Sequence, residues 1–227
     1  MIKRKSTGQL IVISSPSGGG KGTIISKLME NDSKNRWLSV STTSRPIRDN
    51  DIPGITYNFV TKEEFEKLIE KDYFLEYTNY VGNYYGTPKE YIKKKLEQGI
   101  DVILEIEIEG ASNIKKLIPE ALFIFIMPPS LKTMVERLKK RKTDSKDKII
   151  ERFRTAYKEI NEVTRYNYVV VNDDINDAVD KVEAIIKAEK CRVDRIEEVY
   201  LDTKEEEIHE LLMDEEFEND GITEKIQ

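Results

Sequence analysis

The chain has 227 residues, of which 38% are hydrophobic and 35% are charged, and this composition indicates a globular protein with one main core. A single cysteine, Cys191, and a single histidine, His209, exclude an internal disulfide and a multi-histidine metal site. The net charge of −6 is unevenly distributed: residues 197–220 hold twelve acidic residues and one basic residue, a net −11, whereas residues 1–196 carry +5.

Short apolar runs rich in β-branched residues alternate along the chain with segments of helical periodicity. Strands are predicted at residues 10–13, 102–104, 122–126 and 168–171, and helices at residues 22–30, 111–117, 130–141, 146–162 and 175–190. Continuous apolar strands between amphipathic helices are typical of a parallel sheet that is covered on both faces. The sequence therefore predicts an α/β fold.

Residues 39–98 interrupt this alternation and predict an inserted antiparallel subdomain. They are richer in Tyr, Thr, Gly and Asn, with strand-like pieces at 57–60 and 73–80 and turn signals at 51–54 and 81–83. At the end of this region Thr87, Pro88 and Glu90 predict a helix start, with Thr87 as N-cap and Pro88 at the first helical position.

A glycine-rich loop between the first predicted strand and the first predicted helix has the context of a phosphate-binding loop. Its residues are Ser15, Pro16, Ser17, Gly18, Gly19, Gly20, Lys21, Gly22 and Thr23. Backbone N–H groups of such a loop wrap the phosphates of a nucleoside triphosphate, and the lysine reaches the β and γ phosphates. Two departures from the usual pattern are Ser15 in place of a glycine, and Gly22 in place of a magnesium-binding hydroxyl, with Thr23 one position later.

Several further motifs follow in order, and together they resemble the guanylate kinase family from about Gln9 to Lys190. They are S-P-S-G-G-G-K-G-T, S-T-T-S-R-P-x-R, F-L-E, G-N-Y-Y-G-T, L-E-I-E-x-x-G-A, F-I-x-P-P-S and V-N-D-D. The resemblance implies a P-loop parallel sheet flanked by helices within residues 1–190, a GMP-binding insertion at about 39–98 and a helical lid at about 130–160. It also implies transfer of the γ-phosphoryl group of ATP to GMP or dGMP, with Mg²⁺. Residues 191–227, an acidic C-terminal extension, lie outside it.

The resemblance assigns the GMP site to residues of the inserted region and of the strand that follows. These are Ser41, Arg45, Arg48, Tyr57, Glu76, Tyr85, Thr87 and Glu107. A carboxylate at Glu76 can accept both adjacent N–H donors of guanine, with Glu107 assisting, whereas adenine lacks one of these donors. Arginine guanidinium groups and tyrosine hydroxyls suit the acceptor phosphate. Base selection is therefore expected to depend on Glu76.

The resemblance also assigns the donor site, the metal and the lid. Lys21, Arg45, Arg48, Arg141 and Arg152 are the expected catalytic residues, and Arg137, Asn172 and Asp173 are expected to join the phosphate loop in binding ATP. Glu105 and Glu107 are expected to alternate on a strand that ends at Glu109, so that both face the ligand crevice, with Mg²⁺ held near Thr23 and Glu105 through phosphates and water. Glu109 and Lys142 depart from the family pattern, which has Gln and Gly there.

Two other functions remain as alternatives: a non-catalytic guanylate-kinase-like module that binds phosphopeptides, and a monophosphate kinase for another base. The expected partners are ATP and GMP, without nucleic acid or membrane, and the expected location is the cytoplasm. No apolar run approaches the length of a signal peptide core or a membrane span. For the acidic extension the sequence allows an amphipathic helix to about Met213, docked on its own domain or a partner subunit, a disordered end, or a partner-binding element; oligomeric state is not determined.

Overall fold

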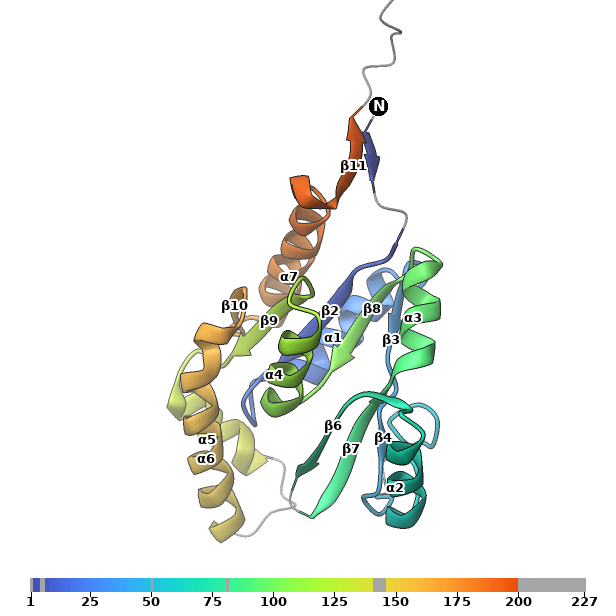
Figure 1. Cartoon of the computed structure of the whole chain (residues 1–227). Coiled ribbons are helices and arrows are strands. Elements are labelled where there is room, and N and C mark those ends of the chain that lie inside the picture. Colours follow the sequence, from blue (N-terminus) through green and yellow to red (C-terminus); the bar gives the residue numbers. More distant parts are fainter. Residues whose placement is uncertain (1, 5–6, 50, 81, 141–145, 200–227) are drawn as a thin grey trace, which may run out of the picture. The chain divides into compact units, whose positions relative to one another are not determined.

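The computed structural model describes residues 2–4, 7–49, 51–80, 82–140 and 146–199, and these residues form two compact units (Figure 1). Residues 7–189 make up the larger unit, and residues 2–4 with 190–199 make up the smaller one.

The larger unit is built on a five-stranded sheet whose strands are all parallel. The strand order is β10 (Tyr168–Val171), β9 (Leu122–Met127), β2 (Leu10–Ser14), β8 (Asp101–Glu105) and β3 (Arg36–Leu38). Four of these strands were predicted, and the α/β fold class is confirmed. The edge strand β3 was not predicted, because its three residues begin with a charged side chain. Arg36 is buried there in a bidentate ion pair with Glu183, with N···O distances of 2.6 Å.

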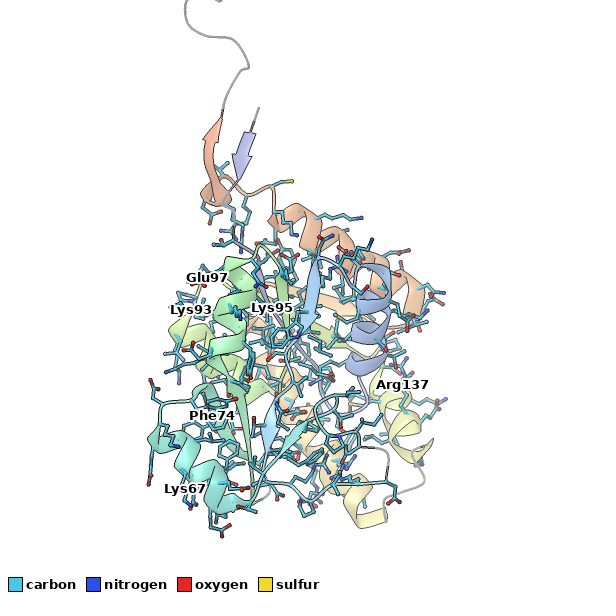
Figure 2. The ribbon with its side chains drawn as sticks, turned by 90° about the vertical axis from the view of Figure 1, so that its right-hand side faces the viewer. Lys67, Phe74, Lys93, Lys95, Glu97 and Arg137 are labelled. Atoms are coloured by element: carbon cyan, nitrogen blue, oxygen red, sulfur yellow. The ribbon has the colours of Figure 1, made fainter. Side chains whose placement is uncertain are left out.

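Helices cover both faces of this sheet, as expected for buried parallel strands. Helices α1 (Lys21–Asn31) and α7 (Ile175–Glu189) pack on one face, with Ile24, Leu28 and Val182 in the core. Helices α3 (Lys89–Glu97) and α4 (Ile108–Leu117) pack on the other face through Ile92 and Ile114. The outer side of α3 is polar, and Lys93 and Glu97 are exposed there (Figure 2).

A second sheet of four strands occupies the predicted insertion. Its order is β5 (Asn58–Phe59), β4 (Thr42–Thr43), β7 (Asn83–Pro88) and β6 (Phe74–Tyr80). The pairs β4·β7 and β6·β7 are antiparallel as predicted, and β5 joins β4 in parallel. Helix α2 (Lys62–Glu70), which was not predicted, begins with a capping box formed by Thr61 and Glu64. Its Phe65 is fully buried and stacks on Phe74, with ring centroids 4.4 Å apart.

Two helices form the predicted lid region. They are α5 (Leu131–Lys140) and α6 (Lys146–Ile160), and a 3₁₀ helix, η1 (Asn161–Arg165), continues from α6 towards β10. Arg141 and Lys142, which the sequence places between these helices, lie outside the described residues.

The smaller unit consists of β1 (Ile2–Arg4) paired antiparallel with β11 (Ile196–Val199), with a 3₁₀ helix, η2 (Val193–Arg195), before β11. The amphipathic helix that the sequence allows in the acidic extension is not present at Ile196–Val199, where strand pairing prevails over a weak helical pattern. The rest of that predicted helix lies outside the described residues. Among the helices of the described ranges, none combines the length and the apolar character that crossing a membrane requires.

Candidate active site

The phosphate loop joins the buried end of β2 to the first turn of α1. Gly18 and Gly20 have positive φ angles of 88° and 90°, a region that favours glycine, and Gly20 is the N-cap of α1. A Cβ atom at Gly20 would overlap the side-chain amide of Asn172. The glycine therefore gives the loop both its left-handed turn and its close contact with Asn172.

Asn172 and Arg137 hold the loop from the side of β10 and α5. The buried Asn172 donates through Nδ2 to the Gly19 carbonyl at 2.8 Å, and Arg137 donates to the Asn172 carbonyl at 3.0 Å. Arg137 also lies 3.5 Å from the Gly19 carbonyl. Asp173, the next residue, is exposed. The structure thus brings two of the three residues expected beside ATP into direct contact with the phosphate loop.

Lys21 extends from the first position of α1 towards the start of α4. Its Nζ donates to the Ile106 carbonyl at 3.2 Å and lies 3.7 Å from Glu107 Oε1. The same Ile106 carbonyl accepts a hydrogen bond of 2.9 Å from the hydroxyl of Ser14. The lysine ammonium is therefore held at the carboxyl ends of β2 and β8, where ligands bind in open α/β sheets.

The predicted alternation of Glu105 and Glu107 on one strand is wrong. Strand β8 ends at Glu105, Glu107 is the N-cap of α4, and Glu109 lies in the first turn of that helix. Glu105 faces the phosphate loop, with Oε1 3.6 Å from the place where a Cβ on Gly22 would stand. Glu107 reaches the same region through its ion pair with Lys21, although its side chain is 57% exposed.

Arg45 is the most constrained of the predicted acceptor-site residues. Its guanidinium lies 2.9 Å from Asp51 Oδ2, donates to the Pro46 carbonyl at 2.7 Å and lies over the Tyr57 ring. Asp51 also accepts a hydrogen bond of 2.7 Å from the backbone N–H of Arg48. Partial burial raises the pKa of Asp51, but these hydrogen bonds outweigh it, and the net effect is a pKa below the ordinary value.

Tyr57 and Tyr85 lie edge to face, with ring centroids 5.9 Å apart. Burial raises the pKa of Tyr57 to about 12, and the negative charges of Glu105 and Glu107 add to the shift. The Tyr57 hydroxyl therefore keeps its proton at neutral pH and can act as a hydrogen-bond donor. The two tyrosines and Arg45 therefore form one cluster of the small-sheet region.

Glu76 is a buried carboxylate on β6 with one oxygen paired and one oxygen unpaired. Oε1 accepts a hydrogen bond of 2.6 Å from Thr87, whereas the buried Oε2 has no hydrogen-bond partner among the described residues. Burial raises the pKa of Glu76 to about 7, the Thr87 hydrogen bond opposes this shift, and the charge of Glu109 adds to it.

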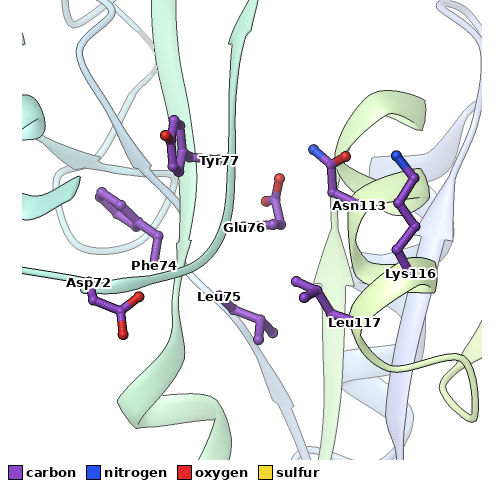
Figure 3. A pocket seen from close by; sticks show the side chains of 8 residues that line it. All are labelled: Asp72, Phe74, Leu75, Glu76, Tyr77, Asn113, Lys116 and Leu117. Atoms are coloured by element: carbon purple, nitrogen blue, oxygen red, sulfur yellow. The ribbon is translucent and has the colours of Figure 1, made fainter. Parts of the chain in front are cut away.

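The space around Glu76 lies between β6 and α4, with Asn113, Lys116 and Leu117 projecting from the helix (Figure 3). A pocket of about 400 Å³ opens there. Glycine at position 110 leaves room for the Glu76 carboxylate, because a Cβ there would stand only 2.9 Å from Glu76 Oε2. The predicted role of Thr87 as a helix cap is wrong, because α3 begins one residue later than predicted, with Pro88 as its N-cap. The Thr87 hydroxyl donates to Glu76 instead.

The remaining predicted site residues are spread around these clusters. Ser41 is partly buried before β4, Thr23 is exposed on α1, and Arg152 is partly buried on α6. Sequence reasoning missed one residue of these clusters, Asp51. Asp51 sits in a segment that was interpreted only as a turn, although an acid three residues after Arg48 could have suggested a partner.

Comparisons with known proteins agree on one family. A family model described as guanylate kinase matches residues 7–189. The guanylate kinase of Caldanaerobacter subterraneus subsp. tengcongensis is 52% identical over 204 residues, which cover 90% of this chain and 98% of that protein. The guanylate kinase of Clostridium tetani is 52% identical over 207 residues, 91% and 99% of the two chains. A crystal structure of guanylate kinase from Anaplasma phagocytophilum is 31% identical, with a TM-score of 0.71 and coverage of 94% and 98%.

Proposed function

The chain belongs to the guanylate kinase family, and we propose that it transfers the γ-phosphoryl group of ATP to GMP and to dGMP. The observation that carries this proposal is the buried Glu76 carboxylate, whose Oε2 has no hydrogen-bond partner among the residues described. A buried acceptor without a donor is costly, so a ligand that supplies N–H donors is favoured at this position.

Guanine carries the donors that this carboxylate requires. Its N1–H and exocyclic N2–H₂ groups lie side by side, so Glu76 can accept from both, while Glu107 and the hydroxyls of Ser41 and Thr87 contact the rest of the base. Adenine has no N1–H, so the buried carboxylate would lose one of its two donors and face the lone pair of N1. Sites built on such hydrogen bonds discriminate by up to about 10⁴-fold, which disfavours a kinase for another base.

The acceptor phosphate is held at the cluster of Arg45, Tyr57 and Tyr85, with Arg48 beside it. Asp51 supports this role because it fixes both the guanidinium of Arg45 and the backbone of Arg48. A guanidinium held in this way can present its remaining donors to a phosphate in a fixed geometry. Residues 39–98 then form the GMP-binding part of the enzyme.

The donor ATP binds at the phosphate loop, residues 15–23, with Asn172, Asp173 and Arg137 beside it. Lys21 neutralises the β and γ phosphates, and the lid of residues 130–160 brings Arg141 and Arg152 over the transferred group. Attack by a GMP phosphate oxygen proceeds in line, without a covalent enzyme intermediate. Closure of the lid excludes water, which would otherwise act as the acceptor. Residues 191–227 are an extension outside this machinery.

Glu105 is the donor-site residue whose chemistry suits Mg²⁺. No cluster of three or more His, Cys, Asp or Glu side chains that could hold a metal occurs among the residues described, so Mg²⁺ would be held mainly by phosphates and water. The Glu105 carboxylate faces Gly22 at the start of α1, and such an oxygen is the ligand type that Mg²⁺ prefers. The Thr23 hydroxyl is the second candidate contact. When bound, Mg²⁺ neutralises phosphate charge.

The alternative of a non-catalytic phosphopeptide-binding module is disfavoured by the phosphate loop. Lys21 at the first position of α1 and the left-handed Gly18 and Gly20 provide the ammonium group and the loop shape that ATP binding needs. A module that bound only phosphopeptides would need none of these features.

The decisive experiment is an ADP-release assay with ATP and each of GMP, dGMP, AMP, CMP and UMP. We expect turnover with GMP and dGMP, and a KM for GMP that rises at least about 100-fold in Glu76→Gln, because an amide proton then faces a guanine donor. Glu70→Gln, an exposed acid at the end of α2, is the matched control and should leave the KM unchanged. Preference for AMP, or no turnover with any monophosphate, would exclude the proposed function.

A further inference from the structure

Gly110 is a buried glycine in the first turn of α4, at a position where the backbone does not need a glycine. It lies inside the helix and does not have a positive φ angle, so an L-residue could adopt the same conformation. Glycine within a helix lowers stability relative to alanine, because it loses more backbone freedom on folding. The glycine therefore weakens α4, and its advantage lies in what surrounds it.

The space beside Gly110 is occupied by the side chain of Glu76, on the strand β6 that packs against α4. A Cβ atom at position 110 would stand 2.9 Å from Glu76 Oε2, 3.3 Å from its Cδ and 3.5 Å from its Oε1. Non-bonded heavy atoms attract best at about 3.5–4.0 Å, so the shortest of these separations is repulsive. The three nearest atoms all belong to one side chain, and a side chain at position 110 would therefore act first on Glu76.

The Glu76 carboxylate is held from two sides. Thr87 of β7 donates to Oε1 at 2.6 Å, and the backbone of α4 at Gly110 limits the space on the Oε2 side. Glu76 is only 8% exposed, and Oε2 has no hydrogen-bond partner among the described residues. One oxygen is thus anchored while the other is confined but unpaired, and a carboxylate confined in this way keeps one orientation towards a ligand.

We propose that Gly110 is a positioning residue for base recognition, because the absence of a side chain lets the Glu76 carboxylate lie against α4 in the orientation that accepts both guanine donors. The inference rests on the proposed function, in which Glu76 binds guanine. A methyl group at position 110 meets the end of a flexible side chain and not backbone, so the chain still folds. The displaced carboxylate loses its hydrogen bond with Thr87 or its alignment with the base, and the cost falls on GMP binding.

The test is Gly110→Ala in the full-length protein, measured by steady-state kinetics and by urea unfolding. We expect the KM for GMP to rise about tenfold, while kcat and the KM for ATP change less than about twofold, because the base and not the transferred group loses contacts. The urea midpoint should stay equal or rise, since alanine favours the helix. Ser112→Ala, which places an alanine elsewhere on α4, is the matched control and should leave both KM values unchanged.

Combination with Glu76→Asp separates a direct effect on Glu76 from a general disturbance of α4. Aspartate is one methylene shorter, so its carboxylate is withdrawn from the added methyl group. We expect Gly110→Ala to lower kcat/KM for GMP about tenfold in the wild-type background and less than about twofold in the Glu76→Asp background. An unchanged KM for GMP in Gly110→Ala, an equal loss in both backgrounds, or a loss that accompanies a lower urea midpoint would overturn the inference. Failure of the wild type to phosphorylate GMP would instead overturn the proposed function.

Discussion

Glu159 on α6 and Glu76 on β6 are two acids whose pKa values burial raises to about 7. Burial is the main cause in both regions, but the neighbouring charges differ: Glu109 adds to the shift at Glu76, whereas at Glu159 Glu107 adds to it and Lys21 opposes it. The same pKa shift therefore arises in two different charge environments. We propose that the Glu76 carboxylate accepts the N–H donors of a base, and in this role the charged form binds better.

The phosphate loop and the acceptor site also differ in how they are built. The loop uses backbone N–H groups of consecutive residues and one lysine, whereas the acceptor site uses side chains from separate strands that need supports such as Asp51 and Thr87. The loop also has supports, Asn172 and Arg137, but its own donors lie in one stretch of sequence. The position of each side chain in the proposed acceptor site therefore depends on a partner such as Asp51 or Thr87.

Loss of Lys21 should have the largest effect, because this side chain supplies the main positive charge of the loop. We expect Lys21→Met to lower kcat by about 10³-fold in the ADP-release assay, since a preorganised charge at the transferred group is removed. Lys27→Met, a change of a lysine on the same helix, should leave kcat nearly unchanged. A loss below about tenfold would mean that the backbone of the loop, and not its lysine, carries the donor site.

The raised pKa of Glu76 should appear as a pH dependence of stability. Because the folded pKa is about 7 and the unfolded value is near 4.5, the folded state binds more protons between these values, and stability falls as the pH rises from about 4.5 to 7. Glu76→Gln cannot lose a proton. We expect its free energy of unfolding relative to wild type to rise by on the order of 2 kcal/mol between pH 5 and pH 8, measured by urea unfolding. A pH-independent difference would show that Glu76 has an ordinary pKa.

Loss of the Asp51 support should have the smallest effect. Asp51→Asn keeps one hydrogen-bond acceptor but removes the charge that fixes Arg45, so we expect the KM for GMP to rise about tenfold with little change in kcat. Asp49→Asn, an exposed acid in the same segment, serves as the comparison. If both variants match the wild type, then Arg45 is positioned by Tyr57 and Pro46 without Asp51.

Much of the larger unit could be predicted because its signals are local. The apolar runs of β2, β8, β9 and β10 and the helical periodicity of α1 and α7 are each contained in one stretch of sequence. Strand β3 and helix α2 escaped prediction: the first is short and begins with Arg36, and the second is recognisable mainly by its Thr61 capping box. The boundary errors at Glu105 and Thr87 arose where a strand passes directly into the start of a helix.

The sequence by itself determined the phosphate loop, the parallel sheet and the resemblance to guanylate kinases, because each depends on residues that are adjacent or regularly spaced. Only the tertiary structure decided that Glu76 is buried against Thr87 and Gly110, that Asp51 pairs with Arg45, and that Asn172 donates to the Gly19 carbonyl of the loop. The physical reason is that burial and charge environment depend on residues brought together from distant parts of the chain. The sequence alone does not distinguish a glutamate that faces water from one that is buried in a binding site.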